Sequence, residues 1–151
     1  MKFILGSISP RKTKGKSREA EALMQEYAAR IGRMTPVEVI VFDSEAALLE
    51  AGSRQTGRPM ATLVLFDSAG EAMTSEEFGR MVGRMRDDGA QRILFGVGPA
   101  DGWSAAARGR AQKLVSFGRM TMPHELARVV VAEQVYRALT ILAGHPYHGG
   151  H

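Results

Sequence analysis

Short apolar runs alternate with amphipathic segments along most of the chain. Residues 61–66 (ATLVLF) and 92–97 (RILFGV) are almost wholly apolar, which is typical of parallel strands covered on both faces. Residues 1–8, 36–42 and 113–117 predict three further strands. Because helical segments separate these strands, the pattern predicts an α/β fold with a mainly parallel sheet and helices on both faces.

Apolar residues spaced three or four positions apart predict the helices. The predicted helices cover residues 17–33, 44–51, 74–89, 105–112 and 124–142. Ser17 is the expected cap of the first helix, Thr74 or Ser75 is the expected cap of the third, and Gly89 ends the third. The residues expected to be buried in the first helix are Ala20, Leu23, Met24, Tyr27 and Ile31.

The last predicted helix is apolar around much of its circumference. Its apolar residues are Leu126, Val129, Val130, Val131, Val135, Leu139, Ile141 and Leu142. A helix that is apolar on more than one face needs cover on more than one side. In a chain of 151 residues we expect a second subunit to supply part of that cover, so the sequence predicts a homodimer.

Composition predicts an ordinary globular protein with one domain, residues 1–151. The apolar fraction is 44 % and the charged fraction 24 %, and a chain of this length can bury one core. The apolar run at residues 3–5 is far too short for a signal peptide or a membrane span. The chain has no cysteine, which excludes disulfides and thiolate zinc sites and fits the cytoplasm.

Charge is unevenly distributed, although the net charge is only +4. Residues 1–34 hold eight Lys or Arg against three Glu, residues 35–78 hold two against eight acids, and residues 79–151 hold ten against five. Basic stretches suit a polyanion, because each neutralised phosphate releases counterions. A solubilising surface explains the same charges equally well. The candidate RNA contacts in the first basic loop are Arg11, Lys12, Lys14 and Lys16.

Two loops that follow predicted strands are candidate binding segments. Gly98 and Gly102 frame a turn after the strand at 92–97, where α/β sheets place ligands, but a structural turn explains them about as well. This turn is not the G-x-G-x-x-G fingerprint of dinucleotide-binding proteins. The second loop, residues 117–124, leads into the last helix, and Pro123 suits the first helical turn. Its exposed backbone groups could hold a small molecule.

The carboxyl-terminal segment concentrates polar and aromatic residues. Glu133 and Arg137 lie four positions apart, in the order that favours a surface ion pair. Three of the four histidines lie in the last seven residues, beside Tyr147, and a solvated tail is the simplest interpretation. Metal binding is possible there, but two His that flank Pro-Tyr with no nearby carboxylate make a poor site, so we expect no metal.

The run FGRMTMPHELARVVVAEQVYRALTI, followed by HPYH, closely resembles the carboxyl-terminal half of the RlmH family, formerly YbeA. These proteins are SPOUT-class methyltransferases with a trefoil knot. The resemblance is strongest from Phe117 to His148 and extends more weakly over nearly the whole chain. It implies an enzyme that uses S-adenosylmethionine to methylate N3 of a pseudouridine in helix 69 of 23S rRNA, in assembled ribosomes. It also implies a homodimer that presents its substrate across the subunit interface.

The same resemblance implies the site residues. Those of the cofactor pocket are Phe66, Gly98, Phe117, Gly118, Arg119, Met120, Thr121 and Met122. The candidate catalytic residues are His148, Arg137 and Tyr147. An imide N3 is mostly protonated at neutral pH, so a base, or a cation that stabilises the anion, would help it attack. His148 and Arg137 suit these two roles, and Tyr147 suits stacking on the nucleobase.

The chain departs from the family pattern at two places. Gly98-Pro99 stands where the family usually has Gly-Gly, and Pro99 removes one backbone donor. Residues 43–59 are short and nearly neutral where the family often has a lysine-rich stretch, which weakens one expected RNA contact. Two other functions stay open: methylation of another RNA such as tRNA, and a non-catalytic ribosome-binding dimer that has lost its cofactor.

Overall fold

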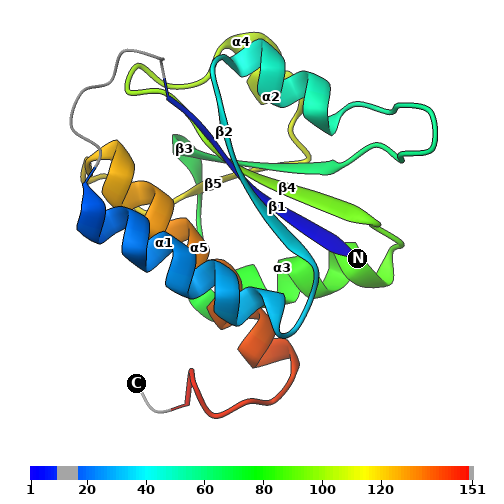
Figure 1. Cartoon of the computed structure of the whole chain (residues 1–151), viewed down its shortest axis with the longest axis vertical. Helices are drawn as coiled ribbons and strands as arrows, with labels where there is room; N and C mark the ends of the chain where they lie inside the picture. The colour runs from blue at the N-terminus through cyan, green and yellow to red at the C-terminus, as the bar shows by residue number, and fades with distance from the viewer. Residues whose placement is uncertain (10–16, 150–151) are drawn as a thin grey trace.

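A computed structural model describes residues 1–9 and 17–149 of the protein. Within these residues, five strands form a single sheet in the order β2-β1-β4-β3-β5 (Figure 1). The strands are β1 (Lys2–Ile8), β2 (Val37–Phe42), β3 (Thr62–Ala72), β4 (Arg92–Val97) and β5 (Lys113–Ser116). All four strand pairings are parallel, so the predicted parallel sheet is confirmed.

Helices cover both faces of this sheet, as predicted (Figure 1). The helices of one face are α1 (Arg18–Gly32), α3 (Ser75–Asp87) and α5 (His124–Leu142), and those of the other are α2 (Glu45–Gly52) and α4 (Ala105–Arg110). Successive side chains of a strand point to opposite faces, so the central strand β4 contributes side chains to the core on each face of the sheet. Phe95 packs in the core beneath α1, α3 and α5, and Leu94 packs in the core beneath α2 and α4.

Side-chain caps determine where the helices begin. The Ser17 hydroxyl accepts a hydrogen bond from the Ala20 amide at 3.2 Å, as predicted. Thr74, rather than Ser75, caps α3, and it forms a reciprocal capping box with Glu77. These caps satisfy amide donors that have no partner within the helix, so the starts of α1 and α3 follow from the local sequence.

Three details of the sequence prediction were wrong. β3 does not end at residue 66 but continues to Ala72, with a shift of register against β5 between Phe66 and Glu71. Pro123 precedes α5 with an extended ψ of 145°, so it is the cap residue and not part of the first turn. Leu23 is 42 % exposed instead of buried, because the core side of α1 is occupied by Met24 and Ile31.

Helix α5 packs against both α1 and α3 and carries much of the core. Arg128 is buried on it and pairs with Glu125 at 3.2 Å and with Glu21 of α1 at 3.4 Å. Leu126, one of the apolar residues of the same helix, is 49 % exposed within this chain. None of the described helices combines the length and the apolar composition that a membrane span requires.

Candidate functional site

The middle of β3 and the segments that follow β4 and β5 surround a hollow of about 340 Å³, which we call the loop pocket. Parallel α/β sheets place their ligands at this carboxyl edge. The pocket is lined mainly by residues 66–68, 97–103 and 117–122. It brings together all the residues predicted to hold the cofactor, namely Phe66, Gly98, Phe117, Gly118, Arg119, Met120, Thr121 and Met122.

The loop after β4 is closely packed beneath the pocket. The Trp103 indole is buried against Gly98, and a Cβ at position 98 would lie only 2.8 Å from it. The indole nitrogen of Trp103 donates to the Phe66 carbonyl at 2.9 Å, which ties this loop to the end of β3. The Gly102 amide donates to the Pro99 carbonyl at 2.9 Å, and Gly102 has a φ of 84°. The turn therefore closes without the N–H that Pro99 lacks.

The loop after β5 leaves the sheet through a glycine. Gly118 has a φ of 111°, a region that disfavours residues with a side chain. The Ser116 hydroxyl accepts from the Gly118 amide at 3.0 Å and donates to the Gly118 carbonyl at 3.1 Å. The rings of Phe66 and Phe117 stack with centroids 4.9 Å apart, while Met120 is 91 % exposed. This side of the pocket therefore offers an apolar aromatic wall and a fixed stretch of backbone.

An ion pair at the edge of the loop pocket was missed by the sequence analysis. The Asp67 side chain is 2 % exposed and pairs with the Arg108 guanidinium at 3.0 Å. Its other oxygen accepts from the Ala69 amide at 2.8 Å. A carboxylate held in this way is a hydrogen-bond acceptor suited to hydroxyl groups. The available signal was an acidic residue directly after a buried strand, at the ligand-binding edge of the sheet.

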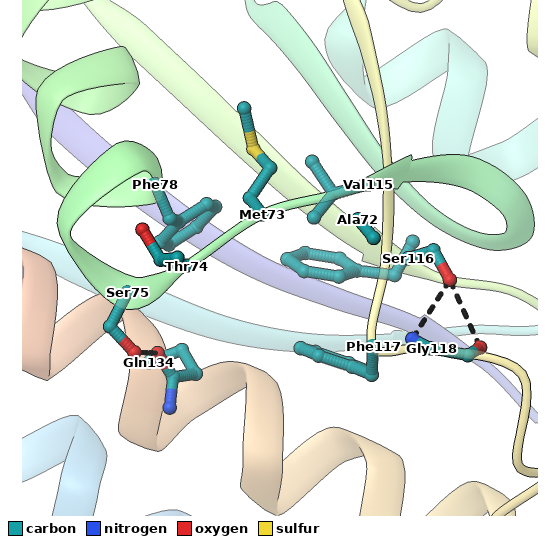
Figure 2. A pocket seen from close by; sticks show the side chains of 11 residues that line it. Ala72, Met73, Thr74, Ser75, Phe78, Val115, Ser116, Phe117, Gly118 and Gln134 are labelled. Atoms are coloured by element: carbon teal, nitrogen blue, oxygen red, sulfur yellow. Dashed lines mark hydrogen bonds between the residues drawn. The ribbon is translucent and has the colours of Figure 1, made fainter.

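A second hollow of about 220 Å³, the α3 pocket, adjoins the loop pocket and shares Phe66 and Phe117 with it. Figure 2 shows its walls, which come from the end of β3, the start of α3, the end of β5 and the side of α5. Ser75 donates to the Gln134 side chain at 2.7 Å across it. The pocket was not predicted, because its lining comes from four separate segments.

Polar side chains of α5, α3 and the tail form one network, which we call the carboxyl-terminal cluster. Its members are Glu76, Glu133, Arg137, Tyr147 and His148. Glu133 accepts from Arg137 at 2.6 and 3.0 Å and from the Tyr147 hydroxyl at 3.0 Å. The His148 ring contacts Arg137 at 3.0 Å and Glu76 at 2.8 Å.

This cluster corrects the two simplest interpretations of the carboxyl-terminal sequence. The Glu133 and Arg137 side chains are 18 % and 15 % exposed, so they are not an open surface pair. The tail is not a solvated extension either, because Tyr147 and His148 both bind back to the helices. The Arg137 guanidinium also lies over the Tyr147 ring at 4.9 Å.

Protonation within the cluster narrows the roles that its members can take. Burial, together with hydrogen bonds to Tyr27 and Glu133, raises the pKa of Tyr147, so its phenol stays protonated at neutral pH. The hydrogen bond to Glu133 raises the pKa of Arg137, which therefore remains a cation. Tyr147 can donate a hydrogen bond or stack, but it is unsuited to accept a proton from a substrate.

The structure brings the three predicted catalytic residues together but does not place them in a pocket. None of Arg137, Tyr147 and His148 lines the loop pocket or the α3 pocket. The nearest link is Gln134, which lines the α3 pocket and donates to Glu133 at 3.0 Å. The predicted RNA contacts Arg11, Lys12, Lys14 and Lys16 lie outside the described residues.

Comparisons with known proteins give a consistent result. The family described as "Predicted SPOUT methyltransferase" matches residues 10–148. A Ribosomal RNA large subunit methyltransferase H from Koribacter versatilis is 46 % identical over 139 residues, covering 91 % of this chain and 94 % of that protein. The protein of the same name from Brucella ovis is 49 % identical over 102 residues, covering 68 % of this chain and 60 % of that protein.

One solved structure supports the fold. The SpoU methyltransferase AviRb from Streptomyces viridochromogenes, in complex with the cofactor AdoMet, superposes with a TM-score of 0.53 at 12 % identity. The match covers 95 % of this chain and 61 % of that one. At this identity the likeness concerns the arrangement of strands and helices alone.

Proposed function

Because this chain belongs to the SPOUT methyltransferase family, we propose that it transfers a methyl group from S-adenosylmethionine to N3 of pseudouridine 1915 in helix 69 of 23S rRNA. Residues 1–151 act as one domain in this proposal, with the knotted topology that its resemblance to the RlmH family implies. The substrate is the rRNA of assembled ribosomes, which places the enzyme in the cytoplasm.

The observation that carries the proposal is the loop pocket. Every residue that the family resemblance implies for cofactor binding lines this one hollow at the carboxyl edge of the sheet. Its chemistry fits an adenosine-containing sulfonium: Phe66 and Phe117 supply an apolar wall, the Trp103 ring packed against Gly98 fixes the loop after β4, and Asp67 offers an acceptor for ribose hydroxyls. When bound, the cofactor supplies an activated methyl group, so the protein must chiefly align a nucleophile with it.

The carboxyl-terminal cluster supplies the groups that act on the nucleobase. His148 takes the N3 proton, Arg137 stabilises the resulting anion, and Tyr147 orients the base by stacking or hydrogen bonding. The basic loop that contains Lys12 and Lys14 contacts rRNA phosphates, so ribosome binding weakens steeply with salt.

A homodimer would bring these two regions together. Within one chain, no residue of the carboxyl-terminal cluster lines the loop pocket. A partner subunit is therefore the simplest source of the catalytic side chains that face the bound cofactor. Leu23 of α1 and Leu126 of α5 are exposed on two adjoining helices, which Arg128 and Glu21 link. These apolar side chains suit a subunit interface in which the cluster of one chain faces the pocket of the other.

The test is methylation of ribosomes purified from cells that lack this protein, with labelled S-adenosylmethionine and mapping of the modified nucleotide. We expect one methyl group at N3 of the helix 69 pseudouridine. Label on tRNA instead would move the substrate to another RNA. Calorimetry that detects no binding of S-adenosylmethionine would favour a non-catalytic ribosome-binding dimer.

A further inference from the structure

His148 is held at both ring nitrogens by charged groups from two different helices. Nε2 lies 2.8 Å from the Glu76 carboxylate in the first turn of α3. Nδ1 lies 3.0 Å from Nη1 of Arg137 on α5. The His148 side chain is 26 % exposed and that of Glu76 is 52 % exposed, so both can be reached by a substrate without unfolding the tail.

These two contacts determine which nitrogen carries the proton. A guanidinium only donates hydrogen bonds, so the Nδ1 atom that faces Arg137 must be the acceptor. A neutral imidazole then carries its hydrogen on Nε2, which donates it to Glu76. The hydrogen bond from His148 in turn lowers the pKa of Glu76, so this carboxylate stays ionised at neutral pH.

We propose that Glu76 is a positioning residue for the methyl transfer: its carboxylate accepts from Nε2–H and, together with Arg137, holds His148 in the Nε2–H tautomer, so that Nδ1 accepts the N3 proton once Arg137 turns toward the nucleobase. This inference rests on the proposed function, in which His148 is the base. Its geometric basis is the contact between α3 and the tail, which joins residues 72 positions apart. An orienting carboxylate on the far side of a catalytic imidazole is an arrangement that also serves other enzymes.

Arg137 first turns its Nη1 hydrogen from Nδ1 to the nucleobase, which frees the Nδ1 lone pair. The N3–H bond then breaks and leaves its electron pair on N3, while the Nδ1 lone pair forms a new N–H bond. The nucleobase becomes an anion that accepts the Arg137 hydrogen bond, and His148 becomes a cation beside the Glu76 carboxylate. The electron pair on N3 is then the nucleophile.

The position of Glu76 is itself fixed. Thr74 and Glu77 form the capping box that sets the first turn of α3, and Glu76 lies within that turn. Ser75, which precedes Glu76, donates a hydrogen bond to Gln134 across the α3 pocket. The charged groups that face His148 are thus Glu76 from α3 and Arg137 from α5, and the protonated phenol of Tyr147 lies beside them.

The direct test is ¹⁵N NMR of histidine-labelled protein at about pH 8.5, well above the ordinary imidazole pKa of about 6.5. A His148→Gln variant assigns the signal. In the wild-type protein we expect the Nε2–H tautomer at this residue. In Glu76→Ala, Arg137 still donates to Nδ1, so a mixture of the two tautomers is expected only when Glu76→Ala is combined with Arg137→Met, whereas Arg137→Met alone should keep the Nε2–H tautomer. A wild-type Nδ1–H tautomer, or the same tautomer in the double variant as in Arg137→Met, would overturn the proposal.

Kinetics on ribosomes complete the test. Glu76→Ala should lower kcat by about tenfold to a hundredfold, with KM for ribosomes and S-adenosylmethionine affinity unchanged. Glu76→Gln should recover part of the rate, because an amide oxygen accepts the same hydrogen bond. Glu38→Gln is the control. The Glu38 carboxylate is 49 % exposed, pairs with Lys2 and lies on the edge strand β2, far along the sheet from β5. The methylation rate of this variant should therefore equal that of the wild-type protein.

The kinetic outcomes separate the two proposals. An unchanged kcat in Glu76→Ala would overturn the positioning role. If the wild-type protein itself methylates no ribosome, the proposed function fails, whatever tautomer NMR finds for His148.

Discussion

The loop pocket is lined mainly by backbone and apolar groups, with the Asp67–Arg108 ion pair at its edge, whereas the carboxyl-terminal cluster consists of charged and aromatic side chains joined by hydrogen bonds. The loop pocket is formed by the middle of β3 and the segments after β4 and β5, and two critical points are residues without a side chain, Gly98 and Gly118. The cluster depends on particular side chains of α3, α5 and the tail. Substitutions should therefore affect cofactor binding in one region and turnover in the other.

Removing the imidazole should separate the two regions most sharply. We expect His148→Ala to lower single-turnover methylation of ribosomes by about a hundredfold or more, because the N3 proton then has no positioned acceptor. The loop pocket is untouched, so S-adenosylmethionine affinity by calorimetry should equal wild type. Normal turnover in this variant would remove His148 from the mechanism.

Adding a methyl group at Gly98 should produce the opposite pattern. The new Cβ would lie 2.8 Å from the buried Trp103 ring, and such overpacking costs about 1–3 kcal/mol. If the loop shifts to relieve it, S-adenosylmethionine affinity in Gly98→Ala falls about tenfold to a hundredfold. Gly109→Ala is the matched control, since nothing lies within 4 Å of its Cβ. Equal affinities in the two variants would show that the loop after β4 does not hold the cofactor.

Neutralising Glu133 should weaken the cluster as a unit. Its carboxylate accepts from both Arg137 and Tyr147, and charge-assisted hydrogen bonds contribute about 1.5–3 kcal/mol each. Because Gln keeps one acceptor oxygen, we expect Glu133→Gln to lower turnover by only about tenfold. We also expect faster exchange of the backbone amides of His145, Tyr147 and His148 in the tail. Unchanged exchange in the tail would mean that Glu133 does not anchor it.

The smallest effect concerns His124, the first residue of α5, which follows the loop that lines the loop pocket. Burial lowers the pKa of His124, so the unfolded state binds more protons than the folded state near pH 6. Its contribution to stability is therefore present above about pH 6.5, the ordinary value, and is lost as pH falls through the lower folded value. Urea unfolding should show a smaller fall in stability between about pH 7 and pH 5 for His124→Gln than for wild type. Identical falls would contradict a buried neutral imidazole.

The sequence predicted the features that depend on nearby residues and missed those that depend on packing between distant segments. The strands and helices were predictable because periodicity, Ser17 and the Thr74 capping box act over a few residues. The long second half of β3 was not, because its polar residues give no strand signal and its pairing with β5 depends on a partner in another segment. The exposure of Leu23 was likewise set by how α1 packs, not by its own spacing.

The sequence by itself determined the α/β class, the capped starts of α1 and α3 and, through the family motif, part of the lining of the loop pocket, because these depend on local patterns and on short contiguous segments. Only the tertiary structure decided which distant residues meet. Asp67 and Arg108 are 41 positions apart, and Glu76 and His148 are 72 apart. Such pairs cannot be recognised from the periodicity of the sequence. Each contact is formed when whole helices and strands pack together, and the residues next to each partner in the sequence do not determine it.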